Sequence, residues 1–421
     1  MRAVTDQTPD QPTDDCACPG PSRRTLFRGL AAAGVATALH GTAFTQTAFA
    51  ATRRAPQVLV VLSMRGAADG MSLVVPHADP VYYAARPRIA VPAGRLLVKD
   101  QFFGLHPHLS ALVPMWNEGR IAAVHATGMP VPNRSHFEAM EIVEDADPGS
   151  SARVGWLNRL LARDSWQHPL QGIALGSGSG PTALHGPHSH SVVPDLGGFT
   201  LAGADKWDTG GRRPASMNLM WARTPGPLGA GARAALGAVK DFTPALRQGT
   251  TPAHGARYPD GDLGSALAAA ARTIRGDVGA EVITVDHGDW DHHAGLGTLE
   301  WGTLQQMTTE LGRALAAFFT DLGTLAEKVT LVTISEFGRR TRENANTGLD
   351  HGHGNVMFVM GAGVKGGYHG TWPGLANTVD DDLRVTTDYR QVLAEVISRR
   401  FGASPAAVFP GVAYRPVGCM R

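Results

Sequence analysis

Acidic residues and histidines are concentrated in one short stretch of the sequence, residues 286–293. This stretch reads Asp-His-Gly-Asp-Trp-Asp-His-His and directly follows the apolar run 281–286, which predicts a buried strand. Carboxylates and imidazoles are ligands for Zn, Mn, Fe or Mg. The stretch is therefore predicted to bind a metal ion or to take part in catalysis, and the alternative is a solvated acidic loop.

A second group of imidazoles precedes the last apolar run. Residues 350–354 read Asp-His-Gly-His-Gly, so that His351 and His353 stand on a loop with glycines beside them. Glycines leave little steric cover over a neighbouring side chain. We predict a ligand or catalytic role for these histidines, against the alternative of a histidine-rich turn.

Charged residues follow the strongest strand pattern, 329–335. Glu336 comes directly after it, and Arg339 lies three residues further on. A guanidinium can bind phosphate, sulfate or carboxylate with two parallel hydrogen bonds, which makes Arg339 a candidate anion binder. The alternative is a surface pair between Glu336 and Arg339.

Two further candidates are single residues. Asp69 lies in a glycine-containing loop after the first strand pattern, 57–63, where it could bind a metal or form an Asp-Gly turn. Ser135 precedes a helical pattern, and with Glu138 it has the spacing of a capping box. The same position suits a nucleophile, because the helix dipole favours an anion there.

The apolar patterns predict an α/β fold with a mostly parallel sheet covered on both faces. In such sheets ligands bind at the carboxyl ends of the strands, and the candidate residues follow the apolar runs. Strands are predicted at 57–63, 121–125, 173–175, 281–286, 329–335 and 356–360, and helices at 109–118, 134–144, 152–163, 263–275, 304–326 and 388–401. We expect one domain over 51–421, with long loops near 176–211 and 250–264.

The first 50 residues have the features of an export signal. The arginine pair Arg23-Arg24 is followed by Leu26 and Phe27. A mildly apolar run over 29–44 comes next, and small residues precede Ala51. The apolar run is too short and weak for a membrane span, which needs roughly 20 apolar residues. We predict a twin-arginine signal peptide over 1–50, transport by the twin-arginine translocase, and a periplasmic or extracellular mature chain without an integral span.

Composition narrows the function further. Lys and Arg number 38 and Asp and Glu number 37, so no basic surplus indicates nucleic-acid binding. Of the three cysteines only Cys419 lies outside the predicted signal peptide. The mature chain can therefore form no internal disulfide and no cysteine-based metal site.

Together these motifs resemble those of the DUF1501 family, a group of bacterial exported proteins. The resemblance rests on residues 62–70, 135–137, 288–293, 335–339 and 350–354 and runs from about Val58 to Ile397. Members are often described as sulfatase-like relatives of the alkaline phosphatase superfamily. The resemblance implies a three-layer α/β sandwich of alkaline-phosphatase-like fold around a mostly parallel sheet.

The same resemblance implies one or two divalent metal ions and a serine or threonine nucleophile at a helix start. It assigns Ser135 as the nucleophile. The implied metal ligands are Asp69, Asp291, His293, Glu336 and either His351 or His353. Glu336 stands where the superfamily usually has an Asp-His pair, so one imidazole is missing from a two-metal site.

The resulting hypothesis is an exported metal-dependent hydrolase of phosphate or sulfate esters, found in small molecules or in an anionic envelope polymer. A divalent ion (Zn, Mn, Mg, Ca or Fe) activates the nucleophile, Ser135 attacks, and Arg339 or Arg65 holds the anionic oxygens. The alternative is a non-catalytic exported binding protein that retains a degenerate hydrolase fold, which the missing imidazole favours.

Overall fold

A computed structural model describes residues 53–421, apart from positions 148, 164, 177 and 205–207. The predicted signal peptide over 1–50, with its arginine pair and two of the three cysteines, lies outside the described residues.

A single large sheet runs through this part of the chain. Its nine strands among the described residues lie in the order β10-β4-β9-β8-β1-β7-β5-β6, with β11 also paired to β4. All neighbours pair in parallel except β9, which runs antiparallel to both β4 and β8. The strands, including the separate β2–β3 pair, are β1 (Val58–Met64), β2 (Val74–Val75), β3 (Gly104–Leu105), β4 (Ile121–Gly128), β5 (Gly172–Leu175), β6 (Ser191–Val193), β7 (Val282–His287), β8 (Val329–Ile334), β9 (Asn355–Gly361), β10 (Gly367–His369) and β11 (Thr387–Asp388).

The sequence of β1 shows why this strand lies at the centre of the sheet. It pairs with β7 on one side and β8 on the other, and all its residues are buried. Val60 and Leu62 pack into the core on one face, whereas Leu59 and Val61 pack into the core on the opposite face. Because both faces are covered, the strand is a continuous apolar run rather than an alternating one.

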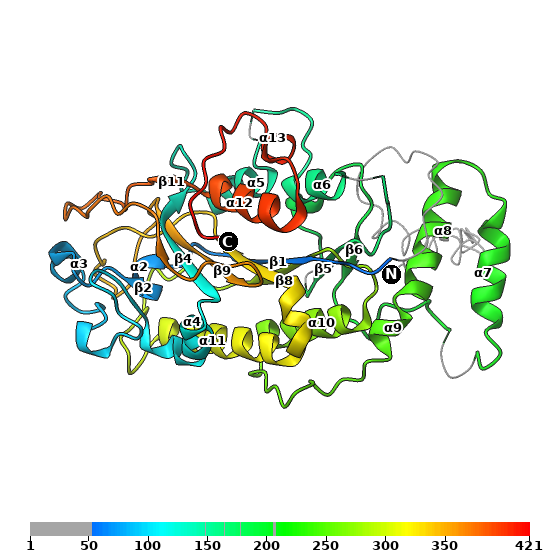
Figure 1. Ribbon diagram of the computed structural model, residues 1–421, viewed down its shortest axis with the longest axis horizontal. Helices are drawn as coiled ribbons and strands as arrows, with labels where there is room; N and C mark the ends of the chain where they lie inside the picture. Colours follow the sequence, from blue (N-terminus) through cyan, green and yellow to red (C-terminus); the bar gives the residue numbers. More distant parts are fainter. Residues whose placement is uncertain (1–52, 148, 164, 177, 205–207) are drawn as a thin grey trace, which may run out of the picture. The chain divides into compact units, whose positions relative to one another are not determined.

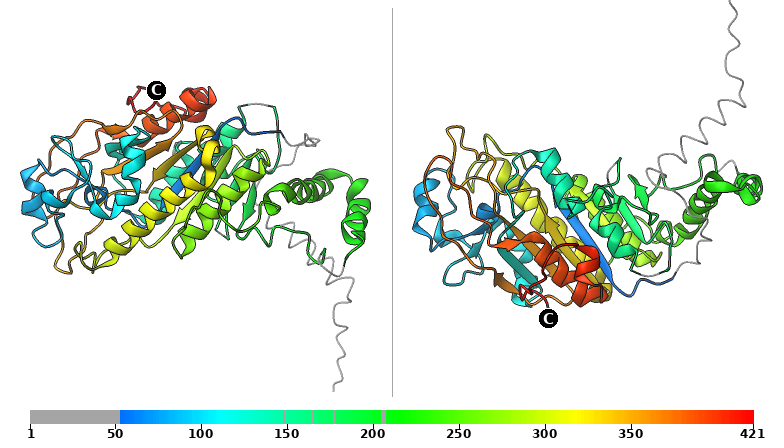
Figure 2. Two further views of the ribbon diagram at one scale, coloured as in Figure 1. Left: turned by 60° about the horizontal axis from the view of Figure 1, so that its bottom comes forward. Right: turned by 90° about the horizontal axis from the view of Figure 1, so that it is seen from above.

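Helices cover both faces of the sheet (Figure 1 and Figure 2). On one face α4, α10 and α11 bury apolar side chains, and on the other α5, α6 and α12 do so. The α-helices are α2 (Gly70–Leu73), α3 (Pro80–Ala85), α4 (Val113–Asn117), α5 (His136–Asp145), α6 (Trp156–Leu161), α7 (Arg212–Ala222), α8 (Gly226–Asp241), α9 (Thr243–Leu246), α10 (Asp262–Gly276), α11 (Thr303–Leu322), α12 (Tyr389–Phe401) and α13 (Pro405–Val408). Short 3-10 helices are η1 (Ala93–Arg95), η2 (Pro107–Leu112), η3 (Thr182–Leu184) and η4 (Gly323–Lys328).

The predicted α/β class, with a mostly parallel sheet and helices on both sides, is confirmed. Each predicted strand and helix overlaps an observed one, but the apolar patterns did not reveal α7 and α8. The buried residues of α8 are only alanine and glycine, so no periodic pattern of large side chains marks this helix. The stretch 176–211, predicted as a loop, contains η3 and β6. Within the described chain, no helix is both long and apolar enough to cross a membrane.

The strand directions bring several loops to one edge of the sheet. Strands β1, β7 and β8 are parallel, and β4 runs the same way because both β4 and β8 are antiparallel to β9. The carboxyl ends of these four strands therefore lie at the same edge as the start of β9. Each candidate motif of the sequence adjoins one of these strand ends.

Candidate metal centre

Three imidazoles and one carboxylate meet at this edge. The Nε2 atom of His351 lies 2.9 Å from Nε2 of His136 and 2.8 Å from Nε2 of His293. The Oδ1 atom of Asp291 lies 3.0 Å from Nε2 of His293 and 3.3 Å from Nε2 of His351. The same oxygen lies 3.5 Å from Nε2 of His136. His136, Asp291 and His351 form a group that could hold a metal ion, and His293 lies beside this group.

Separate segments of the chain supply these four side chains. Asp291 and His293 lie in the loop after β7, and His351 lies in the loop before β9. His136 is the first residue of α5, which follows β4. The cluster therefore depends on the antiparallel course of β9, which places the segment before it at the carboxyl edge of the other strands.

Each imidazole of the cluster also directs its outer nitrogen, Nδ1, at an oxygen acceptor. The pairs are His136 with the Glu336 carboxylate at 2.8 Å, His293 with the Asp350 carboxylate at 3.1 Å, and His351 with the Arg134 carbonyl at 2.8 Å. Because carbonyl and carboxylate oxygens only accept hydrogen bonds, each Nδ1 carries the proton and donates it. In the neutral imidazoles the Nε2 atoms are then left with lone pairs.

This arrangement of protons makes the cluster suitable for a cation. Three Nε2 lone pairs and a carboxylate oxygen face one another, and none of these four atoms carries a proton that it could donate to another. A divalent ion fits this donor set, because nitrogen and oxygen ligands suit Zn and other first-row ions. Histidines that bind metals commonly donate their other ring nitrogen to a carboxylate or a carbonyl, as all three do here.

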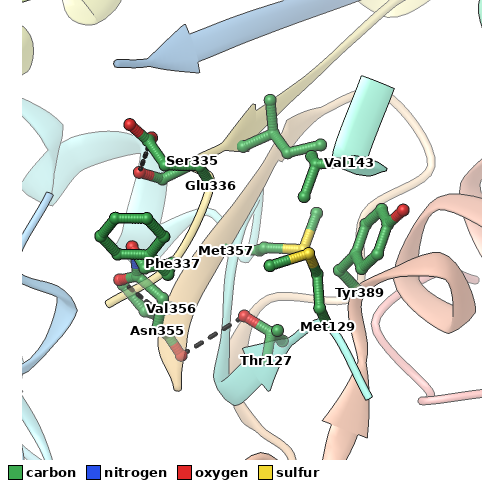
Figure 3. A pocket seen from close by; sticks show the side chains of 12 residues that line it. Thr127, Met129, Val143, Ser335, Glu336, Phe337, Asn355, Val356, Met357 and Tyr389 are labelled. Carbon is green, nitrogen blue, oxygen red and sulfur yellow. Dashed lines mark hydrogen bonds between the residues drawn. The ribbon is translucent and has the colours of Figure 1, made fainter. Parts of the chain in front are cut away.

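The Phe337 side chain supports two of the imidazoles. Its buried ring lies with its centroid 5.0 Å from the ring of His136 and 5.0 Å from the ring of His351. Figure 3 shows a small cavity bordered by Glu336 and Phe337 on one side and by Val143 and Met357 on the other.

Arg339, predicted as an anion binder, has its guanidinium hydrogen-bonded within the protein. Its side chain is buried, and it donates to the carbonyls of Ala67 at 2.7 Å and Leu349 at 2.9 Å. It also donates to Oδ1 of Asp291 at 2.7 Å. Burial acts to raise the pKa of Asp291, but the hydrogen bond and charge of Arg339 outweigh it and lower that pKa to about 2. Arg339 therefore positions Asp291 and keeps it ionised.

Asp69, predicted as a metal ligand, is instead part of a buried ion pair. Its carboxylate oxygens lie 2.5 Å and 3.0 Å from the guanidinium nitrogens of Arg86, and both side chains are buried. One oxygen also accepts from the backbone N–H of Ser72 and caps α2. Its carboxylate is therefore already engaged, and Asp69 is not a member of the group that could hold a metal ion.

Two other predicted ligands also lie outside the converging group. Glu336 accepts from His136, from the backbone N–H of Gly66 at 2.8 Å and from the Ser335 hydroxyl at 3.1 Å, so it orients His136. His353 is buried, and its Nε2 donates to the carbonyl of Met129 at 2.7 Å. His351, rather than His353, is the residue of this motif that faces the cluster.

Ser135 lies at the N-cap position of α5, directly before His136. Its side chain is exposed and makes no capping hydrogen bond, so the capping box predicted with Glu138 does not form. The backbone N–H of Ser135 is bonded to the side chain of Asn133 at 2.9 Å. Its role as a nucleophile stays a prediction.

The residue that the sequence analysis missed is His136. It belongs to the motif in which only Ser135 and Glu138 received roles. The available signal was its place shortly after the strand pattern at 121–125, because that strand ends at the same edge as the others. Asp350 and the carbonyl of Arg134 were missed because an orienting contact has no signature in a single sequence.

Glu336→Ala should weaken zinc binding by roughly 10–100-fold, the usual effect of losing an orienting partner. Without the carboxylate, nothing fixes the proton of His136 on Nδ1. Competition with a chromophoric chelator measures the change. Glu138→Ala is the matched control, because Glu138 is an exposed residue in the first turn of the same helix. Equal affinities for the two variants would show that Glu336 has no orienting role.

The fold and the cluster define this chain as an α/β protein with a histidine–aspartate site at the carboxyl edge of a mostly parallel sheet. Residues 235–418 match the family model of DUF1501, described as a protein of unknown function, so this part of the chain is similar to that family. The match includes Asp291, His293 and His351, whereas His136 lies before it. No curated protein matches the sequence.

Proposed function

We propose that this protein is an exported metal-dependent hydrolase that cleaves phosphate or sulfate esters. The observation that carries the proposal is the convergence of three Nε2 atoms on the Asp291 carboxylate, each imidazole having an oxygen acceptor at Nδ1. The proposal includes the relation of this chain to sulfatases and alkaline phosphatases that the motifs imply. It also includes export by the predicted signal peptide.

His136, Asp291 and His351 are the residues that would hold the ion, and His293 is next to them. A divalent ion such as Zn, Mn, Mg, Ca or Fe, when bound, lowers the pKa of a nucleophile and stabilises the negative charge that develops on the ester. The protein contributes fixed ligand tautomers and an ionised Asp291. These features hold the donor atoms ready before the substrate arrives.

Ser135 is the residue best placed to attack. Its hydroxyl is exposed, adjoins His136 in sequence, and stands at the N-terminus of a ten-residue helix, whose dipole favours a developing oxyanion. Oγ of Ser135 gives up its proton and forms a bond to phosphorus or sulfur while the ester P–O or S–O bond breaks, and the departing alkoxide takes up a proton and leaves as the alcohol. Water then releases the anion from the serine.

A second candidate function is non-catalytic binding by a degenerate hydrolase fold. The observation that favours it concerns the two predicted anion-binding arginines. Arg339 is buried on Asp291, and Arg65 lies 2.7 Å from Glu144 and 3.0 Å from Asp286. Carboxylates therefore balance both guanidinium charges before any anionic substrate arrives.

Metal analysis and turnover on one preparation decide between these functions. We expect about one divalent ion per chain, the ratio for a single ligand cluster, and hydrolysis of aryl phosphates or aryl sulfates. Asp291→Ala should lose both the ion and the activity. Asp289→Asn, which removes an exposed negative charge of the same loop and suits the positive φ of that residue, should keep both.

Two outcomes count against hydrolysis. A wild-type chain without bound metal, or with activity that Asp291→Ala leaves unchanged, contradicts the proposed mechanism. Stoichiometric metal without turnover of any ester in the panel supports the binding protein instead.

A further inference from the structure

Helices α7 and α8 form a hairpin of unusual composition. They pack chiefly on each other, and α7 has no buried residue (Figure 1 and Figure 2). Helices in globular proteins are normally stabilised by burying one apolar face. The exposed side chains of α7 therefore call for an explanation outside the fold itself.

The hairpin is basic: apart from Asp241, the last residue of α8, its charged residues are all positive. Residues 209–240 contain no Asp or Glu, and their basic residues are all exposed: Arg212, Arg213, Arg223, Arg233 and Lys240. Among the described residues none of the five forms an ion pair; Arg213 and Arg233 donate only to backbone carbonyls. The flanking acids are engaged elsewhere, since Asp208 caps the first turn of α7 and Asp241 pairs with His168 at 3.1 Å.

Large apolar side chains project from the same hairpin. Leu219 is 79% exposed, Met220 is 56% exposed, and Leu228 at the start of α8 is 55% exposed. Arg212, Leu219 and Arg223 follow one another at spacings of seven and four residues, which places them on one face of α7. The apolar Leu219 side chain thus stands between the guanidinium groups of Arg212 and Arg223.

We propose that the α7–α8 hairpin binds the surface of an anionic lipid bilayer. Leu219, Met220 and Leu228 enter the boundary between headgroups and acyl chains, while the basic side chains contact the lipid phosphates. Long basic side chains suit this position because their stems lie along apolar surface while their charged ends stay in water. A soluble acidic polymer would use the charges but would not need the apolar side chains.

Sedimentation of the full chain with lipid vesicles tests the proposal. The protein should bind vesicles of phosphatidylglycerol mixed with phosphatidylcholine, bind weakly to phosphatidylcholine alone, and lose affinity as salt is added. Arg212→Gln with Arg213→Gln should weaken binding by roughly 10–30-fold, given the contribution of each basic residue near such a surface. Leu219→Ser with Met220→Ser should weaken it by about 10-fold, through lost apolar burial.

The matched control is Val379→Ser, because Val379 is also exposed, at 70%, but lies outside the hairpin. It should bind like the wild type. Three outcomes would overturn the proposal: no preference for the anionic vesicles, unchanged binding by the Leu219 and Met220 double variant, or a dimer in light scattering that the double variant abolishes. The last result would assign the hairpin to a second copy of the chain.

Discussion

Arg86→Ala should lower the free energy of unfolding by about 3–5 kcal/mol at neutral pH, as expected when one partner of a buried ion pair is removed. Both side chains of the Arg86–Asp69 pair are buried. Arg86 also donates to the carbonyls of Arg340 at 3.0 Å and Thr341 at 2.9 Å, which tie it to the segment after β8. Its loss leaves a buried carboxylate and two carbonyls without their donor.

The pH dependence of this effect follows from Asp69. Burial acts to raise the pKa of its carboxyl, but the charge and hydrogen bonds of Arg86 outweigh this and lower that pKa. A lowered pKa means that the pair stabilises the fold above the unfolded value of about 3.9, and that this stabilisation is lost as pH falls through the folded value. The difference between wild type and Arg86→Ala should therefore shrink in acid.

Urea unfolding at neutral and acidic pH measures both effects. Arg153→Ala is the matched control, because the Arg153–Glu141 pair is exposed and should contribute only about 0–1 kcal/mol. A double variant, Asp69→Asn with Arg86→Met, should recover much of the loss, since it removes both charges. A neutral-pH loss below about 1 kcal/mol for Arg86→Ala would show that the pair is not a main source of stability.

The sequence predicts the sheet better than it predicts the site, and β1 shows why. Its run of Val and Leu indicates burial on both faces, and this pattern is the same whichever elements cover the strand. The antiparallel course of β9 is not recorded in this way, because a buried strand looks the same in either direction. Yet this direction decides that His351 lies beside Asp291.

The individual side chains show the same limit. Asp69 follows a strand and has the right chemistry for a metal, but Arg86 occupies its carboxylate. Arg339 has the right chemistry for an anion, but its donors are used by Asp291 and neighbouring carbonyls. Residue type identifies which groups can do chemistry, whereas their partners, distant in sequence, decide which of them are free to do it.

His351→Ala should weaken zinc binding by more than the roughly 10–100-fold expected for an orienting residue such as Glu336. His351 is central to the cluster, because its Nε2 contacts Nε2 of both His136 and His293 and lies 3.3 Å from Asp291. Removing it leaves His136 and Asp291 as the only members of the candidate ligand group. His293→Ala should have a smaller effect, because all three members of that group remain.

The order of affinities is the sharpest test of the geometry: wild type, then His293→Ala, then His351→Ala. Chelator competition and metal analysis of the folded variants measure it. His369→Ala is the control, since that imidazole lies on β10, outside the candidate ligand group, and bonds to the carbonyl of Lys365; it should leave affinity unchanged. Equal effects of His293→Ala and His351→Ala would mean that both histidines bind the ion. The site would then have four ligands instead of three. A normal affinity for His351→Ala would place the metal elsewhere and end the case for this site.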